Sequence, residues 1–327
     1  MASYGLPYQG SKNQIADWVV KHLPSANTLV DLFCGGCAVT HAALIAGRWN
    51  NYIINDIHGD VPQLFVDAIN GKYTTENCTK WISREEFHEK KETDAYIGLC
   101  WSFKNDRDSY VYGKGIEEPK HLLHNIVFGS TVTDRMQAVR DFLRWLKKQS
   151  DERYAEFLKQ MQRGRDLQTL QNLQRVERLK ELEGLIRQQD LNSLLRIESL
   201  QRLQRLQGLQ GLQGLRVSSK DYREVELPPP TECVIYCDIP YGSEQQHYNI
   251  SFDKQAFLDW AAVQSAPIII SEYNISDSRF EVLDEISKLQ LSDAKNNSRR
   301  VIERLYVPKN QIKTIRERLE NEDLDKE

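Results

Sequence analysis

Residues 238–241, with the sequence Asp-Ile-Pro-Tyr, combine groups that could hold and activate a planar amine. Asp238 follows the apolar run Cys-Val-Ile-Tyr-Cys, so we expect its carboxylate at the end of a buried strand. This carboxylate and the backbone carbonyl of Ile239 can accept the two hydrogens of an exocyclic amine, while Tyr241 stacks on the ring that carries it. The lone pair of such an amine is delocalised into the ring. Two acceptors favour the localised form, which predicts attack on a positioned electrophile such as a methyl sulfonium.

A second candidate site lies at residues 28–37, where a short apolar run containing Asp31 leads through Cys-Gly-Gly-Cys into a helical segment. Glycines between a buried strand and a helix let backbone N–H groups approach a ligand, and the helix N-terminus adds a favourable dipole. Asp56 lies near the end of the next apolar run, a position from which a carboxylate binds ribose hydroxyls. These features predict a site for an adenosyl-type cofactor, although the same pattern can serve packing alone.

Cys34 and Cys37 also have the spacing of a zinc or redox pair. Zinc would need two further ligands, and the sequence offers Cys233 and Cys237 as a second pair. These two cysteines lie in an extended run whose successive side chains point to opposite faces, and strand sequence flanks both pairs. We therefore favour buried thiols that pack as small apolar groups, and we expect no bound metal.

The order of apolar runs predicts an α/β fold. Residues 28–33 and 51–58 are expected strands separated by a helical segment, which is the order of a parallel sheet unit. An aromatic, mainly helical stretch follows. Further strands are expected at 267–276 and 299–309, with a helix between them and a frayed acidic tail after Arg318.

A triplet repeat interrupts this pattern. From Leu167 to Leu215 an aliphatic residue falls at every third position, with Gln188 as the only break. Three residues rotate an α-helix by about 300°, so the apolar stripe would drift around a straight helix. Leu, Gln, Arg and Glu are nevertheless good helix formers, whereas glycines weaken the end of the repeat. A broken helix, a triplet solenoid and a mobile insert all stay open.

Composition and charge bound the class of protein. The chain has 327 residues, 40% of them hydrophobic, and a formal net charge of −4, yet residues 101–220 carry an excess of Lys and Arg. Such a basic stretch can contact phosphates or can be a solvated surface. No stretch approaches the roughly 18 apolar residues of a membrane span, and the N-terminal stretch lacks the order of a secretory signal. We expect a cytoplasmic globular protein with reduced thiols and no membrane contact.

Four motifs carry a resemblance to a known family. They are Pro-Tyr-Gln-Gly-Ser-Lys at 7–12, Asp-Leu-Phe-Cys-Gly-Gly at 31–36, Ile-Ile-Asn-Asp-Ile-His at 53–58 and Asp-Ile-Pro-Tyr at 238–241. In type and order they resemble the Dam-like, alpha-group DNA adenine-N6 methyltransferases. The resemblance implies a Rossmann-like sheet that binds S-adenosylmethionine, with an inserted helical lobe that recognises double-stranded DNA. It implies site-specific methylation of a flipped adenine in a bacterial or phage restriction-modification setting, with no obligatory protein partner evident.

The resemblance also assigns residues and domains. The residues expected around S-adenosylmethionine are Tyr8, Gly10, Lys12, Asp31, Phe33, Gly35 and Asp56. Those expected to hold the flipped base are Asp238, Ile239, Pro240 and Tyr241. The expected domains are a catalytic domain in two parts at 1–70 and 217–327, a helical target-recognition lobe at 71–165, and the Leu/Gln-rich repeat insert at 166–216.

The loop at residues 101–115 lies where the family carries DNA-recognition residues. Lys104, Arg107 and Lys114 are expected to neutralise phosphates, and Asn105 or Tyr110 to reach base edges or fill the gap left by an extruded base. A surface loop with ordinary packing aromatics is the alternative.

Ile239 departs from the family pattern, which usually has proline at this position. The group that the chemistry needs there is a backbone carbonyl, so the departure removes rigidity from the turn but no acceptor. Two alternatives stay open beside the adenine methyltransferase: a DNA-binding protein with impaired catalysis, and a methyltransferase acting on the exocyclic amine of cytosine.

Overall fold

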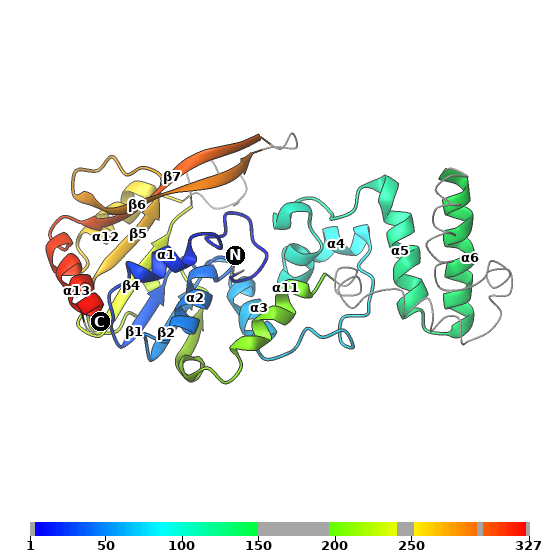
Figure 1. Ribbon diagram of the computed structural model, residues 1–327, viewed down its shortest axis with the longest axis horizontal. Coiled ribbons are helices and arrows are strands. Elements are labelled where there is room, and N and C mark those ends of the chain that lie inside the picture. The colour runs from blue at the N-terminus through cyan, green and yellow to red at the C-terminus, as the bar shows by residue number, and fades with distance from the viewer. Residues whose placement is uncertain (1–3, 150–195, 241–251, 293–296, 325–327) are drawn as a thin grey trace. The chain divides into compact units, whose positions relative to one another are not determined.

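A seven-stranded sheet organises the first of two units into which the chain divides (Figure 1). The computed structural model describes residues 4–149, 196–240, 252–292 and 297–324. Unit 1 contains Met1–Gly71 and Arg202–Glu327, and unit 2 contains Lys72–Gln201. The two parts of unit 1, which lie before and after unit 2 in the sequence, therefore share one sheet.

The strand order in the sheet is β3-β2-β1-β4-β5-β7-β6. The strands are β1 (Thr28–Asp31), β2 (Asn51–Asn55), β3 (Leu215–Ser218), β4 (Cys233–Asp238), β5 (Ile268–Glu272), β6 (Phe280–Ser292) and β7 (Asn297–Pro308). The first five are parallel to one another, and β7 pairs antiparallel with both β5 and β6. This mostly parallel sheet confirms the expected Rossmann-like α/β fold.

The register of β1 with its two neighbours brings acidic strand ends to one edge. Asp31 at the end of β1 stands beside Ile54 of β2 and Tyr236 of β4, two residues before Asp238. All four residues of β1 and the first five of β4 are buried, as expected for parallel strands covered on both faces. Strands β1 and β4 therefore lie side by side in the sheet, as predicted.

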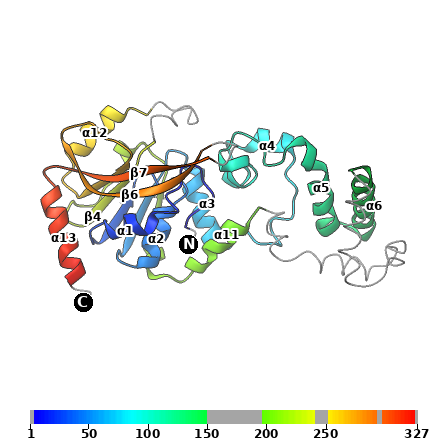
Figure 2. The same ribbon diagram turned by 45° about the horizontal axis from the view of Figure 1, so that its top comes forward.

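Helices cover both faces of the sheet (Figure 2). These helices are α1 (Ala16–Lys21), α2 (Ala38–Ala46), α3 (Asp60–Ile69), α12 (Lys254–Ala262) and α13 (Ile312–Leu324). On one face, Tyr52 of β2 donates its hydroxyl to the carbonyl of Ala43 in α2, at 3.1 Å. On the other face, Phe257 and Leu258 of α12 pack into a core formed by alternate residues of the central strands. No helix in the described parts of the chain is long and apolar enough to cross a membrane.

The helix expected before the last strand is wrong, because residues 280–292 form β6. Leu283, Ile286 and Leu289 are spaced by three residues, which resembles a helical stripe in the sequence. A register shift between Val282 and Asp284 interrupts the alternation that would have indicated a strand. Pairing with β7 along almost the whole length of both strands determines the structure.

The frayed tail expected after Arg318 is also wrong, since α13 continues to Leu324. Glu322 forms an ion pair with Arg48 and accepts a hydrogen bond from the backbone N–H of Ser25, at 2.6 Å. These contacts attach the last turns of the helix to the part of unit 1 that precedes β2.

The end of the triplet repeat forms a broken helix where the structure describes it. A short α-helix, α11 (Glu198–Leu203), is followed by the 3-10 segments η3 (Gln204–Leu206) and η4 (Gln210–Gly214). A 3-10 helix has about three residues per turn, so a triplet stripe keeps to one side. Leu206 of η3 is buried, as are Leu200 and Leu203 of the short α-helix before it. The repeat then enters β3, and its earlier part, up to residue 195, lies outside the described residues.

Unit 2 is mainly helical in its described part. It contains α4 (Arg84–Lys90), the π-helix η1 (Tyr96–Cys100), the 3-10 turn η2 (Phe103–Asn105), α5 (Lys114–Phe128) and α6 (Val132–Gln149). The last two helices pack on each other through Ile126, Ala138, Val139 and Phe142. A separate aromatic cluster is centred on Trp81, which stacks on Tyr112 with 5.4 Å between ring centroids.

Replacing Leu206 by alanine should destabilise unit 1, because its side chain is buried in the 3-10 stripe. We expect a loss of about 2–5 kcal/mol in the free energy of unfolding, measured by urea titration. Gln207→Ala, a change at the exposed neighbouring position, is the control and should stay within about 0.5 kcal/mol of the wild type. Equal effects of the two substitutions would mean that the repeat end is a spacer.

Candidate functional site

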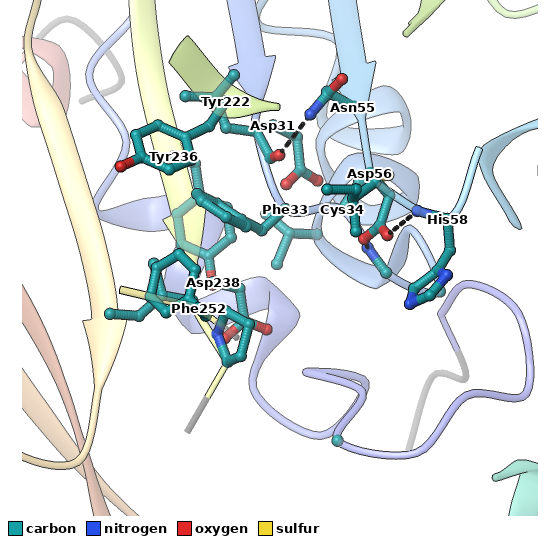
Figure 3. Close-up of a pocket in the computed structure, with 18 of the residues that line it drawn as sticks. Asp31, Phe33, Cys34, Asn55, Asp56, His58, Tyr222, Tyr236, Asp238 and Phe252 are labelled. Carbon is teal, nitrogen blue, oxygen red and sulfur yellow. Dashed lines mark hydrogen bonds between the residues drawn. The ribbon is translucent and has the colours of Figure 1, made fainter. Parts of the chain in front are cut away.

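A pocket opens at the carboxyl edge of the sheet, where the ends of β1, β2 and β4 meet (Figure 3). Ligands of open α/β sheets commonly bind at this edge. The pocket is lined by residues 8–12, 31–36, 38–39, 55–58, 220–223, 236, 238–240, 252–253 and 256. All of these residues belong to unit 1. The lining includes every expected cofactor residue and three of the four expected base-holding residues.

The N-terminal segment packs over the glycine turn that follows β1. The backbone N–H of Leu6 donates to the carbonyl of Gly36 at 2.7 Å, and the N–H of Gly5 donates to Nδ1 of His41 at 2.9 Å. Burial lowers the pKa of His41 to about 4, so its ring is neutral and can accept this bond. The segment thereby carries Tyr8 into the pocket wall, together with Gly10 and Lys12.

Gly35 faces the ring of Tyr8 so closely that a side chain would not fit easily. A Cβ atom at Gly35 would lie 3.0 Å from Cε1 of Tyr8, and its φ of +43° is in the left-handed region. Both observations explain why glycine stands at this position. Both Gly35 and Tyr8 line the pocket.

Asp31 is a buried carboxylate in the wall of this pocket. Its Oδ2 accepts a hydrogen bond from the hydroxyl of Thr40 at 2.6 Å, while Oδ1 has no hydrogen-bond partner among the described residues. Burial raises the pKa of Asp31 to about 7; the bond from Thr40 opposes this shift, and the nearby charges of Asp238 and Asp56 add to it. An orphaned buried acceptor of this kind is suited to a donor group of a ligand.

Asp56 fixes the turn on the other side of the pocket. Its Oδ2 accepts from the backbone N–H of Gly35 and its Oδ1 from that of His58, both at 2.9 Å. The carboxylate connects the glycine turn after β1 with the turn after β2. An ionised carboxylate can accept about four hydrogen bonds, two on each oxygen.

Asn55 is a positioning residue that the sequence reasoning missed. Its buried side-chain amide donates to the carbonyls of Leu32 at 3.1 Å and Lys220 at 3.0 Å, and its Oδ1 accepts from the N–H of Lys220 at 3.0 Å. The side chain therefore joins the ends of β1, β2 and β3 (Figure 3). Its position just before the acidic strand end is the signal available in the sequence.

An aromatic group forms a further wall of the pocket. The ring centroid of Phe33 lies 5.6 Å from that of Tyr222 and 5.7 Å from that of Phe252. Residues 220–223 and Phe252 were not expected at the site. Residues 220–223 follow β3 much as Asp56 follows β2, so recognising β3 as the next parallel strand would have indicated them.

Asp238 closes the pocket at the end of β4. One carboxylate oxygen, Oδ1, is paired with the ammonium of Lys12, which is 3% exposed. Burial raises the pKa of Asp238 to about 6; the charge of Lys12 lowers it, and that of Glu303 raises it further. The side chain of Ile239 turns into the core, where it is 1% exposed, and Pro240 lines the pocket. Tyr241 lies outside the described residues.

The four cysteines of the zinc hypothesis are buried. Cys34, Cys37, Cys233 and Cys237 are all core residues with free thiols, and burial raises the pKa of each thiol. Raised pKa values disfavour the thiolates that bind metals. Within the ranges that the structure describes, no group of three or more His, Cys, Asp or Glu side chains could hold a metal ion.

The residues expected to contact DNA all lie in unit 2, on the loop between η1 and α5 or at the start of α5. Lys104, Asn105 and Arg107 have φ values near +60°, which is unusual for residues with side chains. Lys104 and Lys114 are exposed, whereas Arg107 is half-buried and Asn105 donates its side-chain amide to the carbonyl of Leu99 at 2.8 Å.

Tyr110 is a core residue of unit 2, as the packing alternative had it. It is 4% exposed, and its hydroxyl donates to the carbonyl of Ile82 at 2.7 Å. The aromatic side chain that this loop presents to solvent is Phe103, which is 55% exposed and was missed. Its place before Lys104 and Asn105, which both have left-handed backbone, could not be foreseen from sequence.

Comparison with known families gives one match. A model described as D12 class N6 adenine-specific DNA methyltransferase matches residues 8–264. No curated protein matches the chain. The matched range contains all the residues that line the pocket and ends before β5, β6 and β7.

Two glycines provide a test of the packing of the N-terminal segment. Gly5 and Gly47 have similar φ values, +68° and +63°, so alanine at either position incurs a left-handed strain of about 1–2 kcal/mol. A Cβ at Gly5 would also overlap the carbonyl oxygen of Gly36, whereas a Cβ at Gly47 has no atom within 4 Å. Gly5→Ala should therefore abolish hydrogen-exchange protection of the Leu6 amide, and Gly47→Ala should preserve it. Equal protection in both variants would contradict the packing described.

Proposed function

Because the chain belongs to the D12 class of N6 adenine-specific DNA methyltransferases, we propose that it transfers the methyl group of S-adenosylmethionine to an adenine flipped out of double-stranded DNA. The observation that carries this proposal is the presence of two different half-sites in one pocket. The glycine turn after β1 suits a cofactor, and Asp238 at the end of the adjacent β4 suits the amine. The methyl donor and its acceptor can therefore meet at one edge of the sheet.

The side of the pocket formed by β1 and β2 fits S-adenosylmethionine. When bound, this cofactor supplies an electrophilic methyl group on a sulfonium. The orphaned Oδ1 of Asp31 can accept a hydrogen bond from its ammonium group, and the carboxylate of Asp56, which also lines the pocket, can accept hydrogen bonds from its ribose hydroxyls. Phe33 and Tyr222 offer aromatic surface for its adenine ring.

The side of the pocket formed by β4 fits the target base. The carboxylate of Asp238 and the carbonyl of Ile239 accept the two amine hydrogens, which localises the lone pair on nitrogen. The ring of Pro240 restricts the backbone dihedral angles of the turn that presents this carbonyl. Because the side chain of Ile239 is buried in the core, packing replaces the proline that the usual motif has at this position in holding the turn. We assign Tyr241 to stacking on the base by its place in the motif.

The division of labour between the two units follows from where these groups lie. We assign chemistry to unit 1 and recognition of DNA to unit 2, whose exposed Lys104 and Lys114 can contact phosphates. Phe103 is the residue that we assign to the gap left by the extruded adenine. An exposed aromatic side chain on a strained loop is suited to insertion between base steps.

Replacing Asp238 by alanine should reduce methyl transfer from labelled S-adenosylmethionine to DNA by at least about a hundredfold, because an acceptor used in the transition state is lost. Affinity for DNA, measured by fluorescence anisotropy, should stay within about threefold of the wild type. Asp259→Ala, which removes an exposed carboxylate of the same unit, is the control and should retain full activity. Comparable losses of turnover and of DNA binding in Asp238→Ala would contradict the assigned role.

Replacing Phe103 by alanine should lower the rate on fully paired DNA by roughly tenfold, since an unfilled gap makes extrusion of the base less favourable. On DNA in which the target adenine faces an abasic site, extrusion needs less energy and the loss should largely disappear. Ile116→Ala removes another exposed apolar side chain of unit 2 and should behave as the wild type. An equal loss on both DNA substrates would remove Phe103 from base extrusion.

A further inference from the structure

Four charged side chains, of which Lys12 and Glu303 are buried and Asp238 and Lys288 half-buried, form a chain that extends away from the pocket. The ammonium of Lys12 is paired with Oδ1 of Asp238 and also lies 3.8 Å from Oε1 of Glu303. Oε2 of Glu303 is paired with Nζ of Lys288 at 2.6 Å, and Oε1 accepts a hydrogen bond from the hydroxyl of Ser271 at 2.8 Å. Glu303 itself is 0% exposed. Two cations and two carboxylates therefore alternate from the hairpin to the site.

The register of the sheet produces this arrangement. Ser271 of β5 stands opposite Asp238 of β4, and Leu305 of β7 stands opposite Ser271. Glu303 precedes Leu305 by two residues, so its side chain emerges on the same face of the sheet as Ser271. Lys288 lies on β6, next to β7 in the hairpin (Figure 1). Glu303 and Lys288 both lie beyond the residues that the family model matches, 8–264.

If Asp238 binds the amine as proposed above, Lys12 must release Asp238 and must still have a counter-charge. An amine that occupies the pocket needs a lone pair of Asp238, and the ammonium of Lys12 competes for the same carboxylate. Lys12 cannot simply release Asp238, because an ammonium buried without a counter-charge is strongly unfavourable. A second carboxylate within a short movement of the ammonium meets both demands, and Glu303 is in that position.

We propose that Glu303 is a positioning residue that receives the ammonium of Lys12 when the adenine amine takes its place on Asp238, and that Lys288 holds Glu303 ready for this exchange. The inference rests on the proposed function. It assigns a role in the reaction to the hairpin of β6 and β7, none of whose described residues lines the pocket. Lys12 stays charged and paired throughout, and Asp238 becomes free to bind the amine.

The electrostatics of the site agree with this exchange. Burial alone would raise the pKa of Glu303, but the charges of Lys12 and Lys288 outweigh it and hold the pKa below its usual value. Glu303 is therefore ionised whenever Lys12 needs a partner. Around Asp238 the charges of Lys12 and Lys288 favour ionisation, whereas those of Glu303 and Asp31 oppose it. The buried hydroxyls of Tyr236 and Ser271 complete the surroundings.

Glu303→Gln tests the proposal in the full-length protein. The variant leaves Lys12 held by Asp238 alone, so kcat for DNA methylation should fall by about tenfold or more while both KM values change by less than about threefold. Removing the negative charge of Glu303 also lowers the pKa of Asp238. The acid limb of the pH–rate profile, expected near pH 6 in the wild type, should therefore move to lower pH.

Lys288→Gln should shift the same limb in the opposite direction. Without Lys288 the negative charge of Glu303 is no longer balanced, and the pKa of Asp238 should rise. Opposite shifts from two neighbouring substitutions cannot come from loosened packing. Glu303→Asp, which keeps the charge, should recover part of the rate lost in Glu303→Gln.

Glu285→Gln is the matched control, because Glu285 forms an ion pair with Arg304 between the same two strands, at 2.9 Å, away from Lys12. It should leave kcat and the acid limb unchanged. Equal rate losses in Glu303→Gln, Glu303→Asp and the control, or an unshifted acid limb in Glu303→Gln, would overturn the inference. Failure of the wild-type protein to methylate adenine would instead overturn the proposed function, so the two failures are distinguishable.

Discussion

Three carboxylates close together at one edge of the sheet set the constraint that the rest of unit 1 must satisfy. Asp31, Asp238 and Glu303 come from three strands, and the charges of Asp238 and Glu303 are balanced there by cations brought from elsewhere in the chain. Lys12 arrives because the N-terminal segment packs over the glycine turn, and Lys288 arrives because β6 and β7 form a hairpin. Ion pairs therefore connect the N-terminal segment to β4 and the two strands of the hairpin to each other, in addition to the backbone pairing of the sheet.

The same pocket shows how packing can substitute for a rigid residue. Ile239 replaces a proline of the usual motif, and a more flexible turn would be expected at the place where a carbonyl must point at the substrate. Its side chain is instead buried as part of the core cluster that also contains Leu32, Phe257 and Ile270. Because protein interiors are close-packed, the buried side chain limits the movement of the turn, although the backbone lacks the ring by which proline fixes φ. The carbonyl of residue 239 is thus kept as an acceptor, held by side-chain packing and not by a proline ring.

The parts of the fold that follow from local pattern could be predicted from the sequence, and those that depend on distant partners could not. Strands β1, β2 and β4 and the glycine turn after β1 have apolar runs and short motifs that indicate them. Strand β6 was mistaken for a helix because its bulge breaks the alternation of side chains. Glu303 looks like any charge in a strand, since its partners lie elsewhere in the chain. The triplet period excluded a straight α-helix and fits 3-10 turns at the end of the repeat, where the structure describes it.

Lys12 and Asp238 are separated by 226 residues of sequence, and Glu303 lies farther still. Because synthesis proceeds from the N-terminus, the cation of the site is made early and its two counter-charges late. A chain that stops before β7 would contain every sequence motif of the cofactor and base sites, yet it would lack Glu303, the second counter-charge of Lys12 and the partner of Lys288. The order of the strands thus makes completion of the chain a condition for assembling the site, and partial products of synthesis should be unable to act on DNA.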